Sequence, residues 1–219
     1  MTNAAPFRIK DLGTREFGEV WKQQLELVGA RQRDEIPDTL LLVEHPHVIT
    51  LGRSTKRENL LQPADTPIFE IERGGDITYH GPGQLVGYPI FKLREHERDL
   101  HLYMRRIEET IIVALSRLGL AGGRRAGWTG VWTVPEPQQK LASIGVAVKK
   151  WVTLHGFALN VSTDLSRFAA INPCGLDAAV MTSVSACLGR AVAVDDVKPL
   201  IADAAAAVFE RQTLCQYLR

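Results

Sequence analysis

The stretch RGGDITYHGPGQLVGYPI, residues 73–90, carries glycine at positions 74, 75, 81, 83 and 87. Glycine serves where the backbone must approach another group closely or adopt a positive φ. These glycines bracket a β-type run at residues 77–79, which is followed directly by His80. We therefore expect this stretch to form the wall of a site in which main-chain N–H groups and His80 face a ligand. A glycine-rich hairpin that turns at Pro82 is an equally good interpretation of these residues alone.

Short runs rich in β-branched and aromatic residues flank this stretch and predict strands. Before it, residues 39–53 (TLLLVEHPHVITLGR) predict two strands around a turn at Pro46. Residues 67–72 predict a further strand that leads into Arg73, and residues 85–91 predict a strand that follows or returns. The glycine stretch is therefore expected to connect elements of a β-sheet.

The second half of the chain contains another β-rich region. Residues 127–134 (GWTGVWTV) predict one strand, and residues 141–162 (LASIGVAVKKWVTLHGFALNVS) predict two strands joined by a hairpin at Lys149 and Lys150. A polar loop, PEPQQK, separates the two regions. Lys140 stands at the end of this loop, where a strand is expected to begin.

Three segments show the apolar spacing of an amphipathic helix, and they cover residues 14–31, 99–118 and 195–211. Because the strands come in hairpin-like groups between only a few helices, we predict an α+β fold with a mixed, largely antiparallel sheet. Neither G-x-G-x-x-G nor G-x-x-x-x-G-K-[ST] occurs, which disfavours a doubly wound nucleotide fold. We expect residues 1–219 to form a single domain.

The composition excludes several functional classes. The 26 lysines and arginines nearly balance the 25 acidic residues, and the formal net charge of +1 argues against a general nucleic-acid binder. No apolar run approaches a membrane span, and the N-terminal residues do not resemble a targeting peptide. The three cysteines show no C-x-x-C spacing, so neither a disulfide framework nor a zinc ribbon is indicated. We expect a soluble, cytoplasmic protein in a reducing compartment, with no nucleic-acid or membrane partner.

Cys174 is the best candidate nucleophile. It lies between Pro173 and Gly175, in a context that suits a thiol held at a loop or helix entrance, whereas the other cysteines are expected to be small buried residues. A thiol with a pKa near ~8.5 is mostly protonated at neutral pH, so it needs a nearby cation or base. His80, His155 and Lys140 are the candidates. On the residues alone, a lysine at a loop end is more commonly a solubilising surface residue.

The pair His45 and His47 suggests a metal site. No further ligands accompany the pair in the sequence, however, and Pro46 between the two histidines indicates a turn. We expect no metal.

Several of these segments, in this order, resemble the octanoyltransferase family of lipoate biosynthesis. They are LLLVEHPHVITLGR, RGGDITYHGPGQLVGYPI, GVW, KLASIGV, HGFALNV and NPCGL. The resemblance covers roughly residues 40–183, and its specific parts are the glycine–histidine stretch and the ordered pair of Lys140 and Cys174. It implies a fold similar to the catalytic domains of lipoate and biotin protein ligases.

The resemblance also implies an activity, the transfer of an octanoyl group from octanoyl-acyl-carrier-protein to a specific lysine of a lipoyl domain. The acceptors would be the lipoyl domains of 2-oxoacid dehydrogenase complexes and the glycine-cleavage H protein, with no ATP and no cofactor. Cys174 would carry the acyl group as a thioester, and Lys140 would lower the pKa of the cysteine and shuttle protons. The implied substrate-binding residues are Arg73, Gly74, Gly75, Asp76, Ile77, Thr78, Tyr79 and His80, then Ser143, Ile144 and Gly145, and finally Gly156, Phe157 and Ala158. At position 76 the family more often has a longer polar residue than aspartate.

Chemistry agrees with these roles. Two successive tetrahedral intermediates require a thiolate, donors for the oxyanion and a general acid/base. Lys140 would have to serve as both cation and base, so we expect partial burial beside apolar walls to bring its pKa closer to neutrality. Two alternatives remain open at this stage: an ATP-dependent lipoate-protein ligase, and a non-catalytic protein that binds lipoyl domains.

Overall fold

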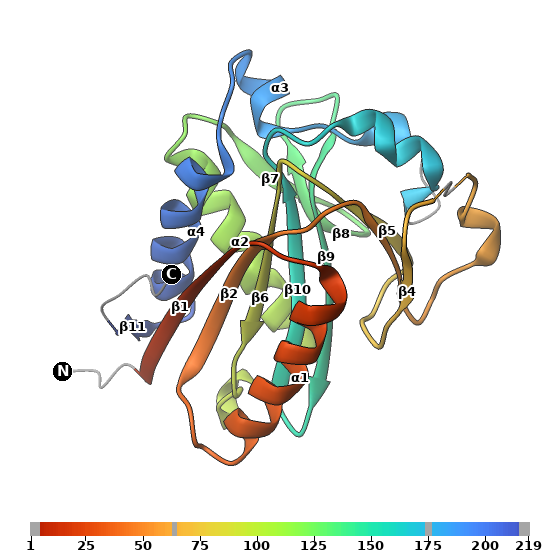
Figure 1. The fold of residues 1–219 in the computed structure, drawn as a ribbon. Coiled ribbons are helices and arrows are strands. Elements are labelled where there is room, and N and C mark those ends of the chain that lie inside the picture. Colours follow the sequence, from red (N-terminus) through yellow and green to blue (C-terminus); the bar gives the residue numbers. More distant parts are fainter. Residues whose placement is uncertain (1–4, 63–64, 174–176, 215–219) are drawn as a thin grey trace.

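A computed structural model describes residues 5–62, 65–173 and 177–214 of the chain (Figure 1). The strands are β1 (Ala5–Thr14), β2 (Asp38–Glu44), β3 (Val48–Leu51), β4 (Ile68–Glu70), β5 (Ile77–His80), β6 (Gln84–Ile90), β7 (Gly122–Arg125), β8 (Trp128–Thr133), β9 (Lys140–Lys149), β10 (Val152–Asn160) and β11 (Arg211–Thr213). The α-helices are α1 (Phe17–Gln32), α2 (Leu100–Ser116), α3 (Val184–Leu188) and α4 (Val194–Val208). Short 3-10 helices are η1 (Arg57–Asn59), η2 (Glu95–Glu97), η3 (Leu165–Ala170) and η5 (Ala178–Val180).

The described strands form two sheets. The larger has the order β11-β1-β2-β6-β10-β9-β8-β7, in which β1 pairs in parallel with β11 and β2 while the remaining neighbours are antiparallel. The smaller sheet has the order β4-β3-β5 and lies beside the larger one (Figure 1). The predicted α+β fold with a mixed, largely antiparallel sheet is therefore confirmed.

Helices cover both faces of the larger sheet, which explains why its central strands read as continuous apolar runs. In β2, Leu40 and Leu42 pack in the cluster with α2 and α4, whereas Leu41 and Val43 pack with Val20 of α1. All residues of β6 and β10 are buried. Each of these strands therefore contributes side chains to two cores.

Most predicted elements are confirmed, with shifted ends. The hairpin of β9 and β10 turns at Lys150 and Trp151, both with positive φ. Helix α2 begins after Asp99, whose Oδ1 accepts from the N–H groups of His101 (2.8 Å) and Leu102 (3.0 Å) and so satisfies two orphan donors. The predicted first helix starts too early, because residues up to Thr14 belong to β1.

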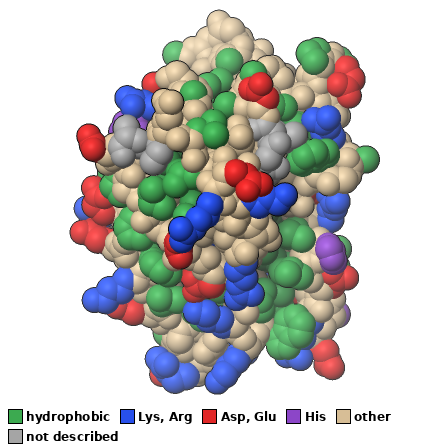
Figure 2. Space-filling view, turned by 90° about the vertical axis from the view of Figure 1, so that its right-hand side faces the viewer, with side chains coloured by type: hydrophobic (Ala, Val, Ile, Leu, Met, Phe, Trp, Pro, Cys, Tyr) green, Lys and Arg blue, Asp and Glu red, His purple; other side chains and the backbone are tan. Residues whose placement is uncertain are grey.

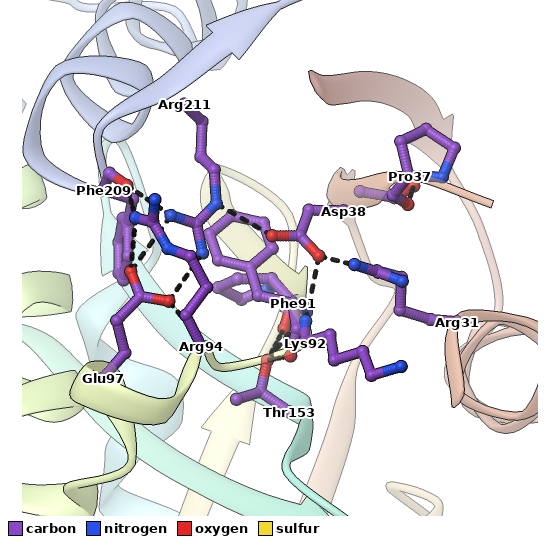
Figure 3. A network of polar contacts seen from close by, with 12 residues as sticks. Arg31, Pro37, Asp38, Phe91, Lys92, Arg94, Glu97, Thr153, Phe209 and Arg211 are labelled. Carbon is purple, nitrogen blue, oxygen red and sulfur yellow. Dashed lines mark hydrogen bonds and ion pairs between the residues drawn. The ribbon is translucent and has the colours of Figure 1, made fainter. Parts of the chain in front are cut away.

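The predicted last helix is too long, because α4 ends at Val208 and β11 follows it. A buried ionic network explains this ending (Figure 3). The guanidinium of Arg211 donates to Asp38 Oδ2 (2.8 Å) and to both oxygens of Glu97 (3.0 Å each). Burial alone would raise the pKa of Glu97, but hydrogen bonds from Arg94 and Arg211 hold it well below its usual range. These contacts fix β11 against the core.

The surface carries both signs of charge. On the face shown in Figure 2, basic, acidic and hydrophobic side chains lie interspersed, with basic side chains along the lower edge. None of the helices in the described part of the chain combines the length and apolarity that a bilayer crossing needs.

Candidate functional site

A cavity of about 390 Å³ lies where the glycine stretch passes over β9 and β10. Its walls are glycine backbone, apolar side chains and a few polar groups. The lining consists of Phe17, Ile71, Arg73, Gly74, Gly75, Asp76, Ile77, Thr78, His80, Val86, Tyr88, Leu100, Met104, Gly127, Trp128, Thr129, Lys140, Ser143, Ile144, Gly145, Val146, His155, Gly156, Phe157 and Ala158. The cavity thus brings Lys140 together with residues of all three segments predicted to bind substrate.

Glycines allow the close approach that forms this cavity. Gly145 of β9 pairs with Gly156 of β10, and a Cβ at Gly145 would lie 2.9 Å from Arg73 Cδ and 3.0 Å from Gly74 O. The N–H of Gly74 donates to Val146 O at 2.9 Å. The backbone of the glycine stretch therefore packs directly on β9, as its composition predicts.

Arg73 and Asp76 hold the start of the glycine stretch in place. Arg73 is buried, and its Nη2 donates to Thr50 O (2.7 Å) and Thr50 Oγ1 (3.0 Å) in β3. The carboxylate of Asp76 accepts from the N–H of Ile77 (2.7 Å) and from Asn59 Nδ2 (2.5 Å). Asn59 O in turn accepts from the N–H of Asn172 (2.8 Å), two residues before Cys174. The short side chain at position 76 thus connects the cavity rim to η1.

His80 is a neutral, buried histidine at the cavity wall. Its Nδ1 lies 2.8 Å from Gln84 Oε1, an acceptor, so Nδ1 carries the proton. Its Nε2 lies 3.5 Å from Thr50 Oγ1. Burial, with a smaller contribution from His45, lowers the pKa of His80 to about 3. His80 can therefore accept or orient a hydrogen bond at neutral pH but carries no charge there.

His45 and His47 have separate partners. His45 contacts Arg15 O (2.7 Å) and Tyr88 Oη (2.9 Å), while His47 Nδ1 contacts Tyr79 Oη at 2.7 Å. Within residues 5–62, 65–173 and 177–214, no group of three or more histidine, cysteine or acidic side chains is arranged to hold a metal. Because His47 Nδ1 lies within hydrogen-bonding distance of Tyr79 Oη, the hydroxyl of Tyr79 already has a partner in His47.

The ring of Tyr79 packs in an apolar cluster with Phe168 and Ile171, and its centroid lies 5.3 Å from that of Phe168. Its neighbours Thr78 and His80 line the cavity, whereas the Tyr79 side chain contributes to this cluster beside the smaller sheet.

Lys140 is the first residue of β9 and is only 2% exposed. Its Nζ lies 5.4 Å from the centroid of the Trp132 ring, and its carbonyl accepts from the N–H of Thr182 at 3.0 Å. The expectation that this lysine is buried beside an apolar wall is confirmed. A parallel bridge pairs Lys140 with Met181, so the chain that follows Cys174 returns beside the lysine.

Cys174 itself lies outside the described residues. On its N-terminal side, Pro173 is buried and Ile171 forms an antiparallel bridge with Leu60. Cys187, which was expected to be a small buried residue, is a free, partly buried cysteine whose Sγ lies 3.6 Å from Thr182 Oγ1.

His155, a second candidate for activating the thiol, lines the cavity from the strand next to Lys140. Its Nε2 lies 3.3 Å from Glu72 Oε2, and its backbone has φ 58°. Burial lowers the pKa of His155 to about 4, against the opposing effect of Glu72. Like His80, it is neutral at neutral pH.

Sequence reasoning missed several cavity residues. Met104 lines the cavity beside Leu100 while also contacting the core. Phe17 and Tyr88 likewise reach the cavity from α1 and β6. No local motif marks Phe17 and Met104, since the same helical spacing serves core and cavity alike, whereas Tyr88 lies within the glycine stretch at residues 73–90.

The comparisons with known proteins agree with this geometry. Residues 17–206 match the family model of the lipoyl protein ligase A/B catalytic domain. An octanoyltransferase of Geobacter metallireducens is 50% identical over 194 residues, which cover 89% of each chain. An octanoyltransferase of Mycobacterium tuberculosis is 48% identical over 203 residues, covering 92% of this chain and 86% of the relative.

Solved structures show the same fold. A bipartite lipoate protein ligase from Thermoplasma acidophilum matches with a TM-score of 0.74 at 18% identity, covering 98% of this chain and 88% of that chain. A lipoate-protein ligase A bound with ATP matches with a TM-score of 0.70 at 15% identity, covering 97% and 90%. The biotin protein ligase of Aquifex aeolicus matches with a TM-score of 0.52 at 13% identity, covering 93% and 69%. By sequence and fold together, the chain belongs to the lipoyl protein ligase A/B catalytic-domain family and, within it, to the octanoyltransferases.

Proposed function

We propose that this enzyme transfers an octanoyl group from octanoyl-acyl-carrier-protein to a lysine of a lipoyl domain, through a thioester on Cys174. The observation that carries the proposal is the cavity of about 390 Å³, which combines apolar walls with a buried lysine and glycine backbone. The acceptors are lipoyl domains of 2-oxoacid dehydrogenase complexes and the glycine-cleavage H protein. The names of the relatives at about half identity support octanoyl transfer.

The apolar walls account for acyl recognition. An octanoyl group has about seven carbons beyond its carbonyl, and at ~0.8 kcal/mol per buried CH₂ their transfer from water contributes at most roughly 5 kcal/mol. Ile144, Val146 and Phe157 provide apolar surface of this kind. Chain length is therefore selected mainly by how much of the acyl chain the cavity buries.

The first half-reaction forms the acyl-enzyme. The thiolate of Cys174 attacks the thioester carbonyl, the tetrahedral oxyanion collapses, and the carrier leaves as a thiol after taking up a proton. A protonated Lys140 favours the Cys174 thiolate before attack and supplies the proton to the leaving sulfur. Backbone N–H groups of the glycine-rich walls stabilise the oxyanion.

The second half-reaction transfers the acyl group to nitrogen. Lys140, now neutral, accepts a proton from the incoming lysine, whose amine attacks the thioester carbonyl. The tetrahedral intermediate expels the Cys174 thiolate and leaves an amide on the acceptor. The reactants and products balance without ATP, and the thiol must stay reduced, as in the cytoplasm.

Intact-mass analysis after incubation with octanoyl-acyl-carrier-protein tests the proposal. The wild type is expected to gain one octanoyl group that a lipoyl domain then removes, and Cys174→Ala is expected to gain none. No adduct on the wild type would sink the thioester mechanism. Modification of the lipoyl domain only with free octanoate and ATP would instead identify a ligase, and binding without modification would identify a non-catalytic lipoyl-domain binder.

A further inference from the structure

Glu108 is a buried carboxylate on α2 that the proposed reaction does not use. Its side chain is 1% exposed. Oε2 accepts from Arg105 Nη1 (2.6 Å) and from Arg124 Nε (2.9 Å), while Oε1 accepts from the backbone N–H of Gly130 at 3.1 Å. A buried carboxylate is tolerated when both oxygens are bonded and its charge is compensated, and both conditions hold here. Oε2 is thus hydrogen-bonded to two cationic side chains, and Oε1 is hydrogen-bonded to the backbone of β8.

Gly130 lies directly against Lys140. It has φ 126°, a backbone conformation that favours glycine. A Cβ at this position would overlap the carbonyl oxygen of Ala142 and would lie 3.0 Å from Lys140 Cε. The pairing of β8 with β9 shifts register at Val131 and Trp132, next to Gly130. A β-bulge leaves a backbone group without a hydrogen-bonding partner in the neighbouring strand. Here the carboxylate of Glu108 accepts the hydrogen bond from the N–H of Gly130.

We propose that Glu108 is a positioning residue for acyl transfer. Its Oε1 holds the backbone of Gly130 against the methylene stem of Lys140. The ring of Trp132, 5.4 Å from Nζ, contacts the same side chain from the same strand. This packing fixes the position of the lysine nitrogen at the cavity wall. The inference rests on the role of Lys140 in the proposed function.

The chain offers a matched control in the next residue. Glu109 also accepts from Arg124, through Nη2 at 2.7 Å, but its side chain is 43% exposed and makes no hydrogen bond with β8 among the described residues. Glu109→Gln therefore removes a neighbouring charge from the same arginine and leaves the contact with Gly130 intact. Glu108→Gln keeps a neutral acceptor for that N–H, whereas Glu108→Leu keeps similar bulk and removes the acceptor.

The experiment compares these full-length variants with Lys140→Ala. The first measured quantity is the octanoylation of a lipoyl domain from octanoyl-acyl-carrier-protein, and the second is the thermal midpoint. The third is the rate at which iodoacetamide alkylates Cys174 as a function of pH, followed on the Cys174 peptide by mass spectrometry. Misplacing a catalytic group by about 1 Å costs roughly 100-fold, so Glu108→Leu is expected to lose about that factor in transfer. Its alkylation profile is expected to change as that of Lys140→Ala does. Glu108→Gln is expected to stay within about tenfold of wild type, and Glu109→Gln to match wild type.

A double-variant cycle decides whether the effect passes through Lys140. If it does, adding Glu108→Leu to Lys140→Ala costs less than about twofold further. The inference is overturned if Glu108→Leu costs its full factor in the Lys140→Ala background, or if it lowers only the thermal midpoint with an unchanged alkylation profile. Should Glu108→Leu fail to fold, Glu108→Asp keeps the charge beside Arg105 and Arg124 but shortens the side chain by one methylene and so withdraws the acceptor from Gly130, with the same expected and contradicting outcomes. Wild-type transfer by Lys140→Ala would instead contradict the proposed function itself.

Discussion

The Nζ of Lys140 lies 5.4 Å from the centroid of the Trp132 ring, and both side chains are buried. The guanidinium carbon of Arg125 lies 4.9 Å from the same ring. An aromatic face attracts a cation more strongly when water is excluded. The tryptophan therefore offers a charged lysine an environment that is apolar yet electrostatically favourable, which suits the proton transfer proposed for Lys140.

Substitution of Lys140 should separate activation of the thiol from proton transfer. Lys140→Ala removes both the cation and the base, so transfer to a lipoyl domain is expected to fall by roughly 100-fold or more, with the fold preserved. Lys140→Arg keeps the cation that favours the thiolate but cannot give up a proton, so it is expected to keep rapid alkylation of the thiol while both adduct formation and onward transfer slow. Adduct mass and lipoyl-domain modification measure the two steps. Unchanged turnover and thiol reactivity in Lys140→Ala would falsify this role.

Acid is expected to destabilise the fold through its buried histidines. Burial lowers the pKa of His45 and His155 to about 4, and burial together with His45 lowers that of His80 to about 3. In the unfolded chain these groups titrate near ~6.5. The unfolded state therefore binds more protons between these values, and the free energy of unfolding falls as the pH drops from about 6.5 toward 4, by roughly 1.4 kcal/mol per pH unit for each such histidine.

Urea unfolding at several pH values measures this slope. His80→Asn is expected to flatten it by about one proton. A stability that stays constant between pH 7 and 4 would contradict the assignment of neutral buried histidines.

The network around Arg211 should be a major source of stability. Arg211→Met removes the cation shared by Asp38 and Glu97, both of which stay buried, and the expected loss is about 3–5 kcal/mol. Arg117→Met breaks the exposed pair with Asp203 and is expected to cost less than about 1 kcal/mol. The free energies of unfolding in urea give both values. Equal losses from the two variants would show that burial of the pair does not decide its importance.

Gly156 should not tolerate a side chain. A Cβ there would overlap the carbonyl oxygen of Gly87 and lie 2.6 Å from Pro89 Cδ, so β10 would have to separate from β6. Gly156→Ala is expected to destabilise the protein by about 1–3 kcal/mol and to impair octanoyl transfer. The control Gly29→Ala, inside α1, is expected to stabilise by up to about 1 kcal/mol. A thermal midpoint of Gly156→Ala equal to that of wild type would contradict the close approach of the two strands.

The sequence determined the elements whose signals are local. The helix at residues 100–116 and the hairpin of β9 and β10 follow from apolar spacing and from the turn at residues 149–151. The edge strand β7 (GGRR) has no strand-like composition, and β11 (RQT) pairs with β1 where Arg211 also reaches the buried acids. The partner of β11 is β1, at the opposite end of the chain, so local periodicity does not reveal this strand.

The residues of the candidate site likewise include some that the sequence identifies and others that only tertiary packing places there. The glycine stretch at residues 73–90, Lys140 and the motif of Cys174 can be identified from their sequence and order. Met104 and Phe17 reach the cavity only because α2 and α1 pack against it. Glu108 and Glu109 are identical neighbours in the sequence, but the first is buried and bonded to Gly130 while the second is 43% exposed. Only the tertiary structure distinguishes them, because the orientation of α2 decides which carboxylate meets the backbone beside the lysine.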